Sequence, residues 1–448
     1  MTNDLKQRFK ITSKLKLFVF SIIGIIFFFI PVIQQEEKKS TPMVFAIAKV
    51  KGFLAPILPV LLIVSTFLLV IFCIITKFTN KSDKLTNIYG KTSNISLALY
   101  VIGAILSIVI HFNLGPEALM AKSVGPGSFG IASSVLVTIM VAGVMVVLIS
   151  EFGFLEFLGT LIEPLMRPIF KVPGYASIDA ITSFVANPTV GIYFTSKLYT
   201  NKKYTTREAS AISTNFSIIS LGFFMVLAES SGLLDYYGQI VISAFIISFI
   251  MAAIIIRIPP ISSMSDTYID GSPRAKDQNI DTSKPIFVRG YEKALEKAES
   301  VNTAKAFKDN AFEVLIFSQR VAVYILTISV ITMLLVENTN LFMYLGKPFI
   351  PILNLFNIPD ASQVAPGILL GLAEVALPAA YIGTTGVTAS AAFFLVILTS
   401  VQIMMFSNSI PSILESEIPL KMWQLLLVFF VRTLIAIPIA AIFTKVIF

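Results

Sequence analysis

Amide and carboxyl side chains lie beside two prolines, each of which interrupts a long apolar segment. Asn187 precedes Pro188 in the first segment, and Glu374 stands four residues before Pro378 in the second. Proline removes a backbone N–H and clashes with the preceding turn, so each segment is expected to form two short helices. Backbone groups freed at such a break need protein or water around them. The two segments therefore predict a wet, protein-lined pocket between them.

Glu374 is the strongest candidate for a functional charge. It lies about one helical turn from Pro378, and an unpaired charge at the centre of a membrane costs at least about 3 kcal/mol. It is expected to bind a coupling proton, a coupling cation or a donor group of a solute. The alternative is a structural ion pair, with Arg432 in the last apolar segment as the partner.

The residues around the first proline favour an uncharged polar solute. The amide of Asn187 both donates and accepts hydrogen bonds. Near it stand Pro188 and three hydroxyl side chains, those of Thr182, Ser183 and Thr189. Free N–H groups at the start of the following helix also favour an anionic group such as a carboxylate. The alternative is that Asn187 only caps that helix.

Further polar residues lie on the same or neighbouring apolar segments. Asp179, eight residues before Asn187, is a second candidate for ion coupling, and the alternative is a solvated acid at a helix start. Asn215, Gln402 and Asn408 are candidate solute ligands. The alternative for these three residues is a polar contact between helices.

The composition places these residues in a membrane. Of 448 residues, 56% are hydrophobic and only 13% are charged, about half the charged fraction of soluble domains. The apolar residues form runs as long as a spanning helix, without the alternation of barrel strands. The sequence therefore predicts an all-α polytopic membrane protein in contact with the lipid bilayer.

Nine plain spanning helices are expected, at 17–33, 53–76, 95–113, 129–150, 209–228, 237–256, 314–336, 388–410 and 421–446. Lys and Arg gather before the first span, in 77–91 and in 197–207. Because basic loops stay on the cytoplasmic side, the N-terminus is expected to be cytoplasmic in a multi-pass protein of the cell membrane. The net charge of +8 therefore does not indicate a nucleic-acid partner.

The two halves of the chain share an order of features. Each interrupted segment is followed by Ala-Ser-Ala, at 209–211 and 389–391, which opens the first of two spanning helices. By the count of spans, 174–199 enters and leaves on the cytoplasmic side, whereas 360–386 enters and leaves outside. The sequence therefore predicts two inverted repeats, each with a re-entrant hairpin whose tip approaches the midplane. The alternative is that each proline only kinks an ordinary spanning helix.

This order divides the chain into four parts. Residues 1–128 are the N-terminal transmembrane helices, and 129–256 and 311–448 are the two repeats. Residues 257–310 are a cytoplasmic linker, in which Val288 to Asp309 interleaves apolar with charged residues. That segment predicts an amphipathic helix on the membrane surface, with a solvated linker helix as the alternative.

A family resemblance is carried by Gly174-Tyr-Ala-Ser-Ile-Asp-Ala-Ile-Thr-Ser-Phe-Val-Ala-Asn-Pro-Thr-Val-Gly-Ile-Tyr193 and by Thr206-Arg-Glu-Ala-Ser-Ala211. These residues resemble the Gate, or nucleoside-recognition, domain, and the whole arrangement resembles the YjiH family of bacterial membrane proteins. The resemblance implies a transporter-like fold with paired hairpins, and it leaves the substrate open. Iron-transporting relatives use a cytosolic GTPase and a cysteine-containing pore. Neither a P-loop motif nor a cysteine in the repeats is present here.

The expected function is alternating-access transport of a small polar organic solute, such as a nucleoside-like compound, an amino acid or a small peptide. H⁺ or Na⁺ is the expected coupling ion. The alternative is a non-transporting gate subunit of a membrane complex. No enzyme chemistry, cofactor or metal is expected, because His111 and Cys73 are the only residues of their types. The sequence leaves a homo-oligomer open.

Overall fold

The computed structural model describes residues 11–30, 32–35, 38–78, 92–185, 188–274 and 284–448. One sheet occurs in these residues, an antiparallel pair of the strands β1 (Ile33–Gln35) and β2 (Lys38–Ser40). The other elements of the described chain are helices. The expected all-α fold is therefore confirmed, apart from this short strand pair.

The helices form three consecutive groups. The N-terminal group contains α2 (Ile11–Phe29), α3 (Pro42–Leu54), α4 (Leu58–Phe78), α6 (Asn94–His111) and α7 (Glu117–Met120). The second contains α8 (Gly125–Met145), α9 (Val147–Ser150), α10 (Phe154–Phe170), α11 (Ala176–Val185), α12 (Pro188–Thr200), α13 (Thr206–Asn215), α14 (Leu221–Ser230), the 3-10 turn η1 (Leu234–Tyr236) and α15 (Tyr237–Ile255). After α16 (Ile286–Ser300), the third contains α17 (Thr303–Asn338), α18 (Leu341–Gly346), α19 (Phe349–Leu355), α20 (Ala361–Ala373), α21 (Ala376–Thr384), α22 (Ala389–Ser400), α23 (Ser409–Leu414) and α24 (Met422–Ile447).

The second and third groups repeat one order of elements. Each opens with a long helix, α8 or α17, and continues with a pair of short helices, α11 with α12 or α20 with α21. A broken helix follows, α13 with α14 or α22 with α23, and then a long helix, α15 or α24. Each broken helix starts at a threonine cap, because the hydroxyls of Thr205 and Thr388 accept the first free N–H groups.

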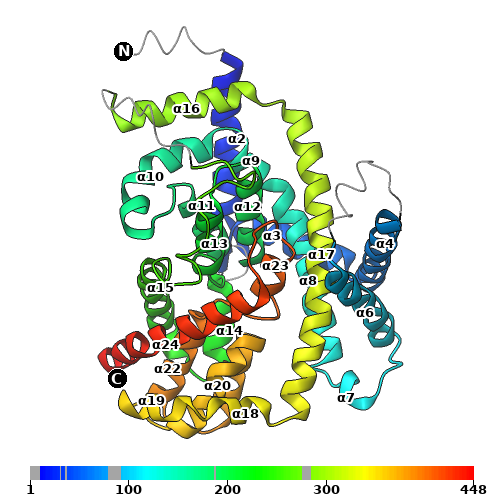
Figure 1. Ribbon diagram of the computed structural model, residues 1–448, viewed down its shortest axis with the longest axis vertical. Helices are drawn as coiled ribbons and strands as arrows, with labels where there is room; N and C mark the ends of the chain where they lie inside the picture. The colour runs from blue at the N-terminus through cyan, green and yellow to red at the C-terminus, as the bar shows by residue number, and fades with distance from the viewer. Residues whose placement is uncertain (1–10, 31, 36–37, 79–91, 186–187, 275–283) are drawn as a thin grey trace.

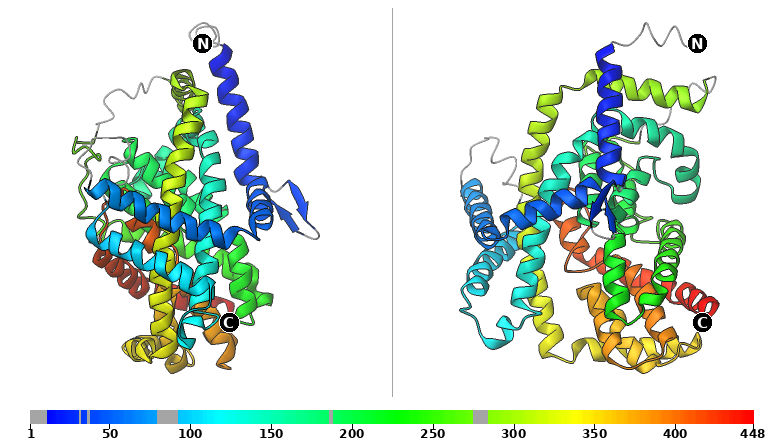
Figure 2. Two further views of the ribbon diagram at one scale, coloured as in Figure 1. Left: turned by 90° about the vertical axis from the view of Figure 1, so that its right-hand side faces the viewer. Right: turned by 180° about the vertical axis from the view of Figure 1, so that it is seen from behind.

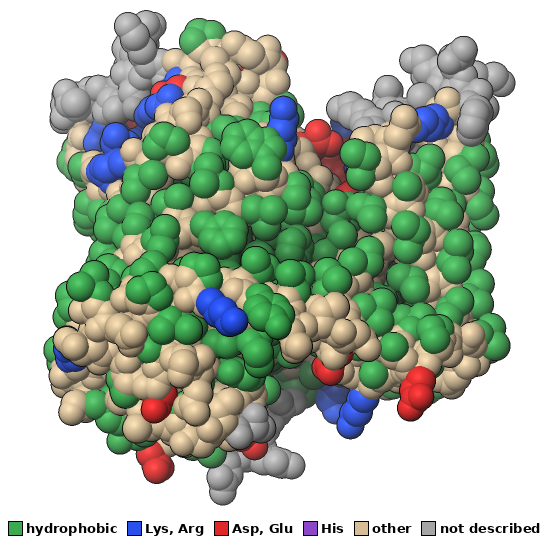
Figure 3. Space-filling view, turned by 60° about the horizontal axis from the view of Figure 1, so that its bottom comes forward, with side chains coloured by type: hydrophobic (Ala, Val, Ile, Leu, Met, Phe, Trp, Pro, Cys, Tyr) green, Lys and Arg blue, Asp and Glu red, His purple; other side chains and the backbone are tan. Residues whose placement is uncertain are grey.

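Seven helical stretches of the described chain are long and apolar enough to cross a membrane: α2, α4, α6, α8 with α9, η1 with α15, α17 and α24. They match seven of the nine expected spans, so the chain is a multi-pass α-helical membrane protein. On the face drawn in Figure 3, hydrophobic side chains cover a broad band, and most charged side chains lie toward the margins. This distribution fits a surface in contact with lipid.

Two broken helices replace the unbroken spans expected at 209–228 and 388–410. α13 stops before the stretch 216–220, and α22 stops before 401–408. Hydropathy misses both breaks because most of the intervening residues are apolar. The side chain of Arg432, from another helix, donates hydrogen bonds to backbone carbonyls at the two breaks. These carbonyls would otherwise accept N–H groups of the next helical turn.

α16 is shorter than the amphipathic helix expected over Val288 to Asp309. It stops at Ser300, and the Asn302 side chain then caps α17 by accepting the N–H of Lys305 at 3.1 Å. The buried side of α16 packs against α10 and the N-terminal helix α2, and it consists of Gly290, Ala294, Leu295 and Ala298. The apolar side of α16 therefore packs on other helices of the protein.

The helices pack around separate hydrophobic cores. The largest core is built mainly from α10 to α15 and α19 to α24, which we name the repeat body. Smaller cores join α4, α6, α8 and α17, which we name the pillar body. α8 and α17 run side by side along the long axis, and α4 and α6 flank them (Figures 1 and 2). Figure 1 also places α10 and α16 at one end of this axis, and α18 and α19 at the other.

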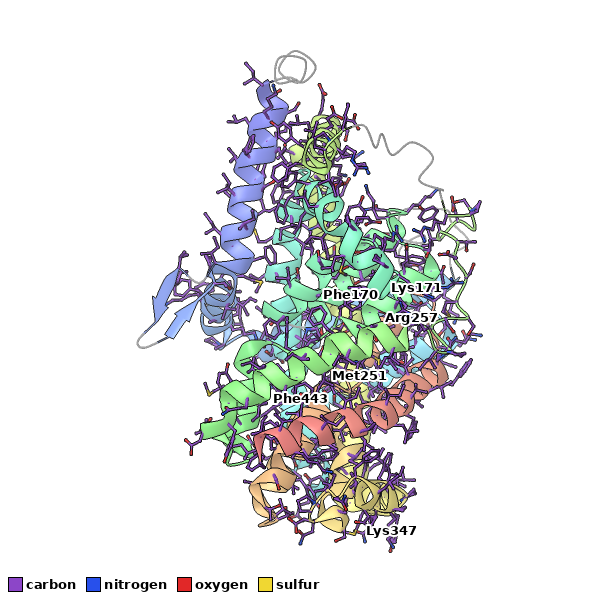
Figure 4. All side chains as sticks on the ribbon, turned by 90° about the vertical axis from the view of Figure 1, so that its left-hand side faces the viewer. Phe170, Lys171, Met251, Arg257, Lys347 and Phe443 are labelled. Carbon is purple, nitrogen blue, oxygen red and sulfur yellow. The ribbon has the colours of Figure 1, made fainter. Side chains whose placement is uncertain are left out.

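The long helices that close the two repeats lie against each other. Figure 4 shows α15 beside α24, with Met251 and Phe443 labelled on them. At the end of α15, Arg257 donates to the carbonyl of Ile169 at 2.8 Å, next to Phe170 and Lys171 (Figure 4). This contact ties α15 to α10, whereas Lys347 lies at one end of the long axis of the molecule (Figure 4).

One glycine marks a close backbone contact between the repeats. A Cβ added to Gly383 of α21 would lie 2.1 Å from the carbonyl oxygen of Ser230, at the end of α14. We expect Gly383→Ala to destabilise the protein by about 2 kcal/mol, because the two backbones must move apart. The apparent melting temperature in detergent measures this loss. Gly238→Ala is the control, since a Cβ there meets nothing within 4 Å; equal melting temperatures would contradict the prediction.

Candidate functional site

Each pair of short helices has its break beside a proline. Pro188 is the first residue of α12, as expected, because a first-turn proline lacks only an N–H that has no partner in the helix. In the second pair the break lies earlier than predicted. α20 ends at Ala373 and α21 begins at Ala376, so Pro378 lies inside the first turn of α21. The same tolerance of first-turn proline explains this shift.

Glu374 therefore stands at the second break itself and not one turn away. Its backbone is extended, with φ −157° and ψ 136°, between α20 and α21. Its Oε1 accepts the N–H of Ala376 at 3.4 Å, at the start of α21. The Ser407 hydroxyl lies beside the carboxylate, and it is buried without a hydrogen-bond partner among the described residues. The Ser407 N–H also donates to the carbonyl of Ala373 at 3.2 Å.

The first break meets the same stretch of chain. The Thr189 hydroxyl, one residue into α12, donates to Oδ1 of Asn408. It also accepts a hydrogen bond from Ser412 of α23 at 3.2 Å. Thr189 and Ser412 are fully buried, whereas Asn408 and Glu374 are partly exposed. We name these five residues the tip cluster: Thr189, Glu374, Ser407, Asn408 and Ser412. It joins both breaks through the stretch between α22 and α23.

Several expected site residues lie elsewhere or cannot be placed. Asn187 lies outside the described residues. Thr182 and Ser183 are buried on α11, and the Ser183 hydroxyl has no partner in the described chain. Asn215 is the last residue of α13, and Gln402 lies just after the end of α22. Both side chains contact α24, as the next two paragraphs describe.

Arg432 joins the two broken helices. Fully buried on α24, it donates through Nε and Nη2 to the carbonyl of Val401, at 3.1 and 2.8 Å. Through Nη1 it donates to the carbonyl of Thr214 at 3.2 Å and to Oδ1 of Asn215 at 2.6 Å. The alternative reading, an ion pair of Arg432 with Glu374, is therefore wrong. Carbonyls at two helix C-termini carry partial negative charge and replace the carboxylate as its partners.

Gln402 makes the corresponding contact in the second repeat. Its amide nitrogen donates to the carbonyl of Ile368 on α20 at 3.1 Å and to the Thr433 hydroxyl at 2.9 Å. Its carbonyl oxygen is buried without a partner among the described residues. The following residue, Ile403, has φ +66°, a strained conformation for a β-branched side chain. Such strain persists only where the surrounding contacts impose it.

Asp179 is buried, not solvated at the mouth of a helix. It is 1% exposed and accepts a hydrogen bond from the Tyr204 hydroxyl at 2.5 Å. Thr195 of α12 lies beside it. No ion pair of Asp179 occurs in the described residues, and its Oδ1 has no hydrogen-bond partner there. A buried carboxylate in this position is stable when it is protonated or bound to a cation.

A charged cavity of about 360 Å³ lies between α9, α12, α16 and α17. Lys197 of α12 pairs with Glu151 at 3.5 Å and donates to Oδ1 of Asn310 at 2.6 Å. Glu151 also pairs with Lys297 of α16 at 2.7 Å. Burial raises the pKa of Glu151, but Lys197 and Lys297 outweigh it and hold the pKa below its ordinary value. The carboxylate is therefore charged near neutral pH.

One face of α12 connects the cavity with the tip cluster. Thr189, Tyr193 and Lys197 stand four residues apart and therefore share a side of the helix. Tyr193 donates to Asn310 of α17 at 3.0 Å, next to the contact of Lys197. Sequence reasoning missed Tyr193, Asn310 and Ser412. The spacing of polar residues along α12 was a usable signal, whereas nothing in the sequence links it to α17.

The described residues contain no group of three or more His, Cys, Asp or Glu side chains able to hold a metal ion. The available chemistry is that of hydroxyl, amide and carboxyl groups. Such groups recognise polar solutes, protons and simple cations.

The bridging role of Arg432 leads to a stability prediction. Lysine has one compact ammonium and cannot reach Val401 and Asn215 together. We expect Arg432→Lys to cost about 3 kcal/mol, because buried carbonyls lose their donors. The melting temperature in detergent reports this loss. Arg257→Lys is the control, because Arg257 also donates to carbonyls but is exposed; a similar loss in both variants would refute the role of Arg432.

Comparisons with known proteins agree with part of the sequence resemblance. Residues 132–234 match the Gate family model, described as nucleoside recognition, which confirms the expected Gate domain in the first repeat. Two structures of outward-facing CNTnw double variants are similar over the whole chain. One gives a TM-score of 0.47 at 12% identity, covering 97% of this chain and 98% of that one. The other gives a TM-score of 0.34 at 13% identity, with 97% of each chain covered.

Two curated bacterial proteins are related in sequence. The sporulation integral membrane protein YlbJ of Bacillus subtilis is 31% identical over 86 residues, which are 17% of this chain and 21% of that protein. The uncharacterized protein BpOF4_10220 of Alkalihalophilus pseudofirmus is 30% identical over 444 residues, which are 98% of this chain and 95% of that protein. The chain therefore belongs to the family of BpOF4_10220 and carries a Gate domain.

Proposed function

We propose that this protein is a secondary transporter that moves a small polar organic solute by alternating access. The tip cluster is its solute site. The observation that carries this proposal is the meeting of both helix breaks on one stretch, through Thr189 with Asn408 and through Glu374 with Ser407. Broken backbone of this kind occurs at membrane depth only around a protein-lined or wet space. Transporters place their substrate sites at such paired breaks.

The chemistry of the tip cluster favours a neutral, hydroxyl-rich or amide-bearing solute. Hydroxyls and an amide offer both donors and acceptors, whereas Glu374 accepts from a solute donor or binds a cation. A nucleoside meets these requirements, and the Gate family's description as nucleoside recognition supports that class. Amino acids and small peptides remain in the proposal, since their ammonium groups also suit Glu374. Asn187, Pro188, Thr182, Ser183 and Pro378 stay part of the proposed site region.

We infer further that the two helix pairs are re-entrant hairpins in inverted repeats. The opposite ends occupied by α10 and by α18 with α19 support this reading (Figure 1). The division into 1–128, 129–256, 257–310 and 311–448, the cytoplasmic N-terminus and membership of the YjiH family belong to the same proposal. A homo-oligomer is left open.

Coupling to H⁺ or Na⁺ is part of the proposal. Glu374 and Asp179 are its first candidates, because each is a carboxylate without an ion pair in the described chain. A charge kept in such surroundings needs a proton or a cation. A second candidate function is a non-transporting subunit of a membrane complex. The similarity to YlbJ over 86 residues leads to it, because that protein is named a sporulation integral membrane protein and not a transporter.

The cavity is proposed as one end of the solute path. The shared face of α12 leads from Thr189 to Lys197 at the cavity wall. Tyr193 and Lys197 both donate to Asn310 and hold α12 against α17. Opening of this end requires those two hydrogen bonds to break. They therefore form a gate between the repeat body and the pillar body.

The solute site leads to a transport prediction. In proteoliposomes tested with labelled uridine, alanine and dialanine, we expect Glu374→Gln and Asn408→Ala to lower uptake of the transported compound at least about tenfold. Each of these two variants loses a hydrogen bond to a charged or polar group of the solute. A hydrogen bond that involves a charged group contributes about 1.5 to 3 kcal/mol. Glu229→Gln, at the exposed end of α14, is the control. Uptake at wild-type level in both site variants would disprove the assignment.

The gate leads to an accessibility prediction. In a Cys73→Ser background, a cysteine at Ser150 reports on the cavity, because Ser150 lines it and is 3% exposed. We expect Asn310→Ala to speed labelling by a hydrophilic maleimide about tenfold, since two donors lose their acceptor.

The matched control for the gate is Asn338→Ala at the other end of α17, where the amide contacts only the carbonyl of Leu334 among the described residues. It should leave the labelling rate at Ser150 unchanged. The gate assignment is rejected when Asn310→Ala and Asn338→Ala label at the same rate.

A further inference from the structure

Glu415 is a buried carboxylate between the repeat body and the pillar body. It directly follows α23 and is 8% exposed. Its Oε2 accepts a hydrogen bond from the Tyr100 hydroxyl of α6, whereas its Oε1 has no partner among the described residues. Arg320 of α17 lies close enough to act on its charge. The carboxylate therefore faces two helices of the other body.

α23 also contacts the solute site. Ser412, three residues before Glu415, donates to Thr189 of the tip cluster. The N–H of Glu417 donates to the Ser196 hydroxyl of α12 at 3.2 Å. Buried side chains of α23 belong to the repeat body, whereas Tyr100 belongs to the pillar core. A movement of one body against the other changes the surroundings of Glu415 and carries the tip cluster with it.

We propose that Glu415 binds and releases the coupling proton of the transporter. This inference rests on the proposed function. The proton adds to the carboxylate, with Oε1 as the oxygen without a partner, and it leaves when Arg320 and Tyr100 stabilise the carboxylate again. Burial favours the neutral carboxyl, whereas a nearby guanidinium and a donated hydrogen bond favour the charged form. Glu415 also stands at the C-terminal end of α23, where the partial negative charge of the helix end disfavours the charged carboxylate.

The link between proton and solute follows from the placement of these groups. The ionisable side chains that interact with Glu415 in the described chain are Tyr100 on α6, Arg320 and Tyr324 on α17, and Cys73 on α4. α12 meets the same segment through the uncharged Ser196. All four ionisable groups therefore belong to the pillar body. Since protonation depends on where α23 lies relative to them, proton binding and α23 position influence each other reciprocally.

Asp179 differs from Glu415 in this respect. The contacts of its side chain are with Tyr204 and Thr195, within 25 residues of it in the same repeat. Those partners move together with Asp179, so a movement between the two bodies leaves its surroundings unchanged. Between these two buried acids, the geometry therefore assigns the moving proton site to Glu415.

Infrared difference spectra of the protein in lipid bilayers, recorded across a pH series, test proton binding without any solute. We expect a carboxyl C=O band that appears as the pH falls, that is absent in Glu415→Gln and that is retained in Glu417→Gln. Glu417 is the matched control because it lies two residues away and is exposed. Tyr100→Phe removes a donor to the charged form, so its band should appear at higher pH. An unchanged band in Glu415→Gln, or an unshifted band in Tyr100→Phe, would overturn the proposal.

Transport measurements then separate the proposal from the function it rests on. Proteoliposomes with a pH gradient of about one unit are tested with labelled uridine, alanine and dialanine; one coupled proton supports about tenfold accumulation. We expect Glu415→Gln to lose this accumulation while counterflow of the same probe stays within about twofold of wild type. Accumulation retained in Glu415→Gln overturns the proton site alone. Absence of counterflow in the wild-type protein overturns the proposed transport of these probes, and the infrared result still decides the proton site.

Discussion

The fold depends on how interrupted backbone is satisfied where no water is expected. A helix that stops inside a membrane leaves carbonyls without N–H partners, each costing free energy when buried. Here one guanidinium on α24 takes the carbonyls at the ends of two broken helices, Thr214 in one repeat and Val401 in the other. Arg432 carries several donors in a fixed planar group, which suits this bridging contact. The two repeats are therefore held at their breaks by a single side chain.

The same constraint places the candidate site. Because α22 stops at Ser400, the next eight residues, 401–408, are free to bring polar groups to both helix pairs. Glu374 reaches this stretch from the second repeat and Thr189 from the first. Strain at Ile403 is held in place by the contacts around it. A polar site between two repeats thus follows from where their helices end, and not from any motif of adjacent residues.

Much of the architecture was predictable from local rules. Apolar runs identified seven of the spanning helices, and Pro188 marked the start of α12. The breaks in α13–α14 and α22–α23 were not predictable, because they arise from contacts with Arg432, more than 30 residues away from Val401 and over 200 from Thr214. Pro378 misled the prediction, because proline is tolerated in a first turn and the break lies earlier, at Glu374 and Val375. Glu374 was chosen for its charge and for its place about one helical turn from Pro378, and the structure puts the break at Glu374 itself.

A solute bound at the tip cluster is expected to protect a specific set of backbone amides. Hydrogen–deuterium exchange of the protein in lipid nanodiscs, with and without uridine, alanine or dialanine, measures this protection directly. A compound that binds should protect amides in 189–190, 373–377 and 404–412 together, since it contacts both helix breaks and the stretch that joins them. Protection by a bound compound confined to other segments, with these three unchanged, would contradict a solute site at the tip cluster.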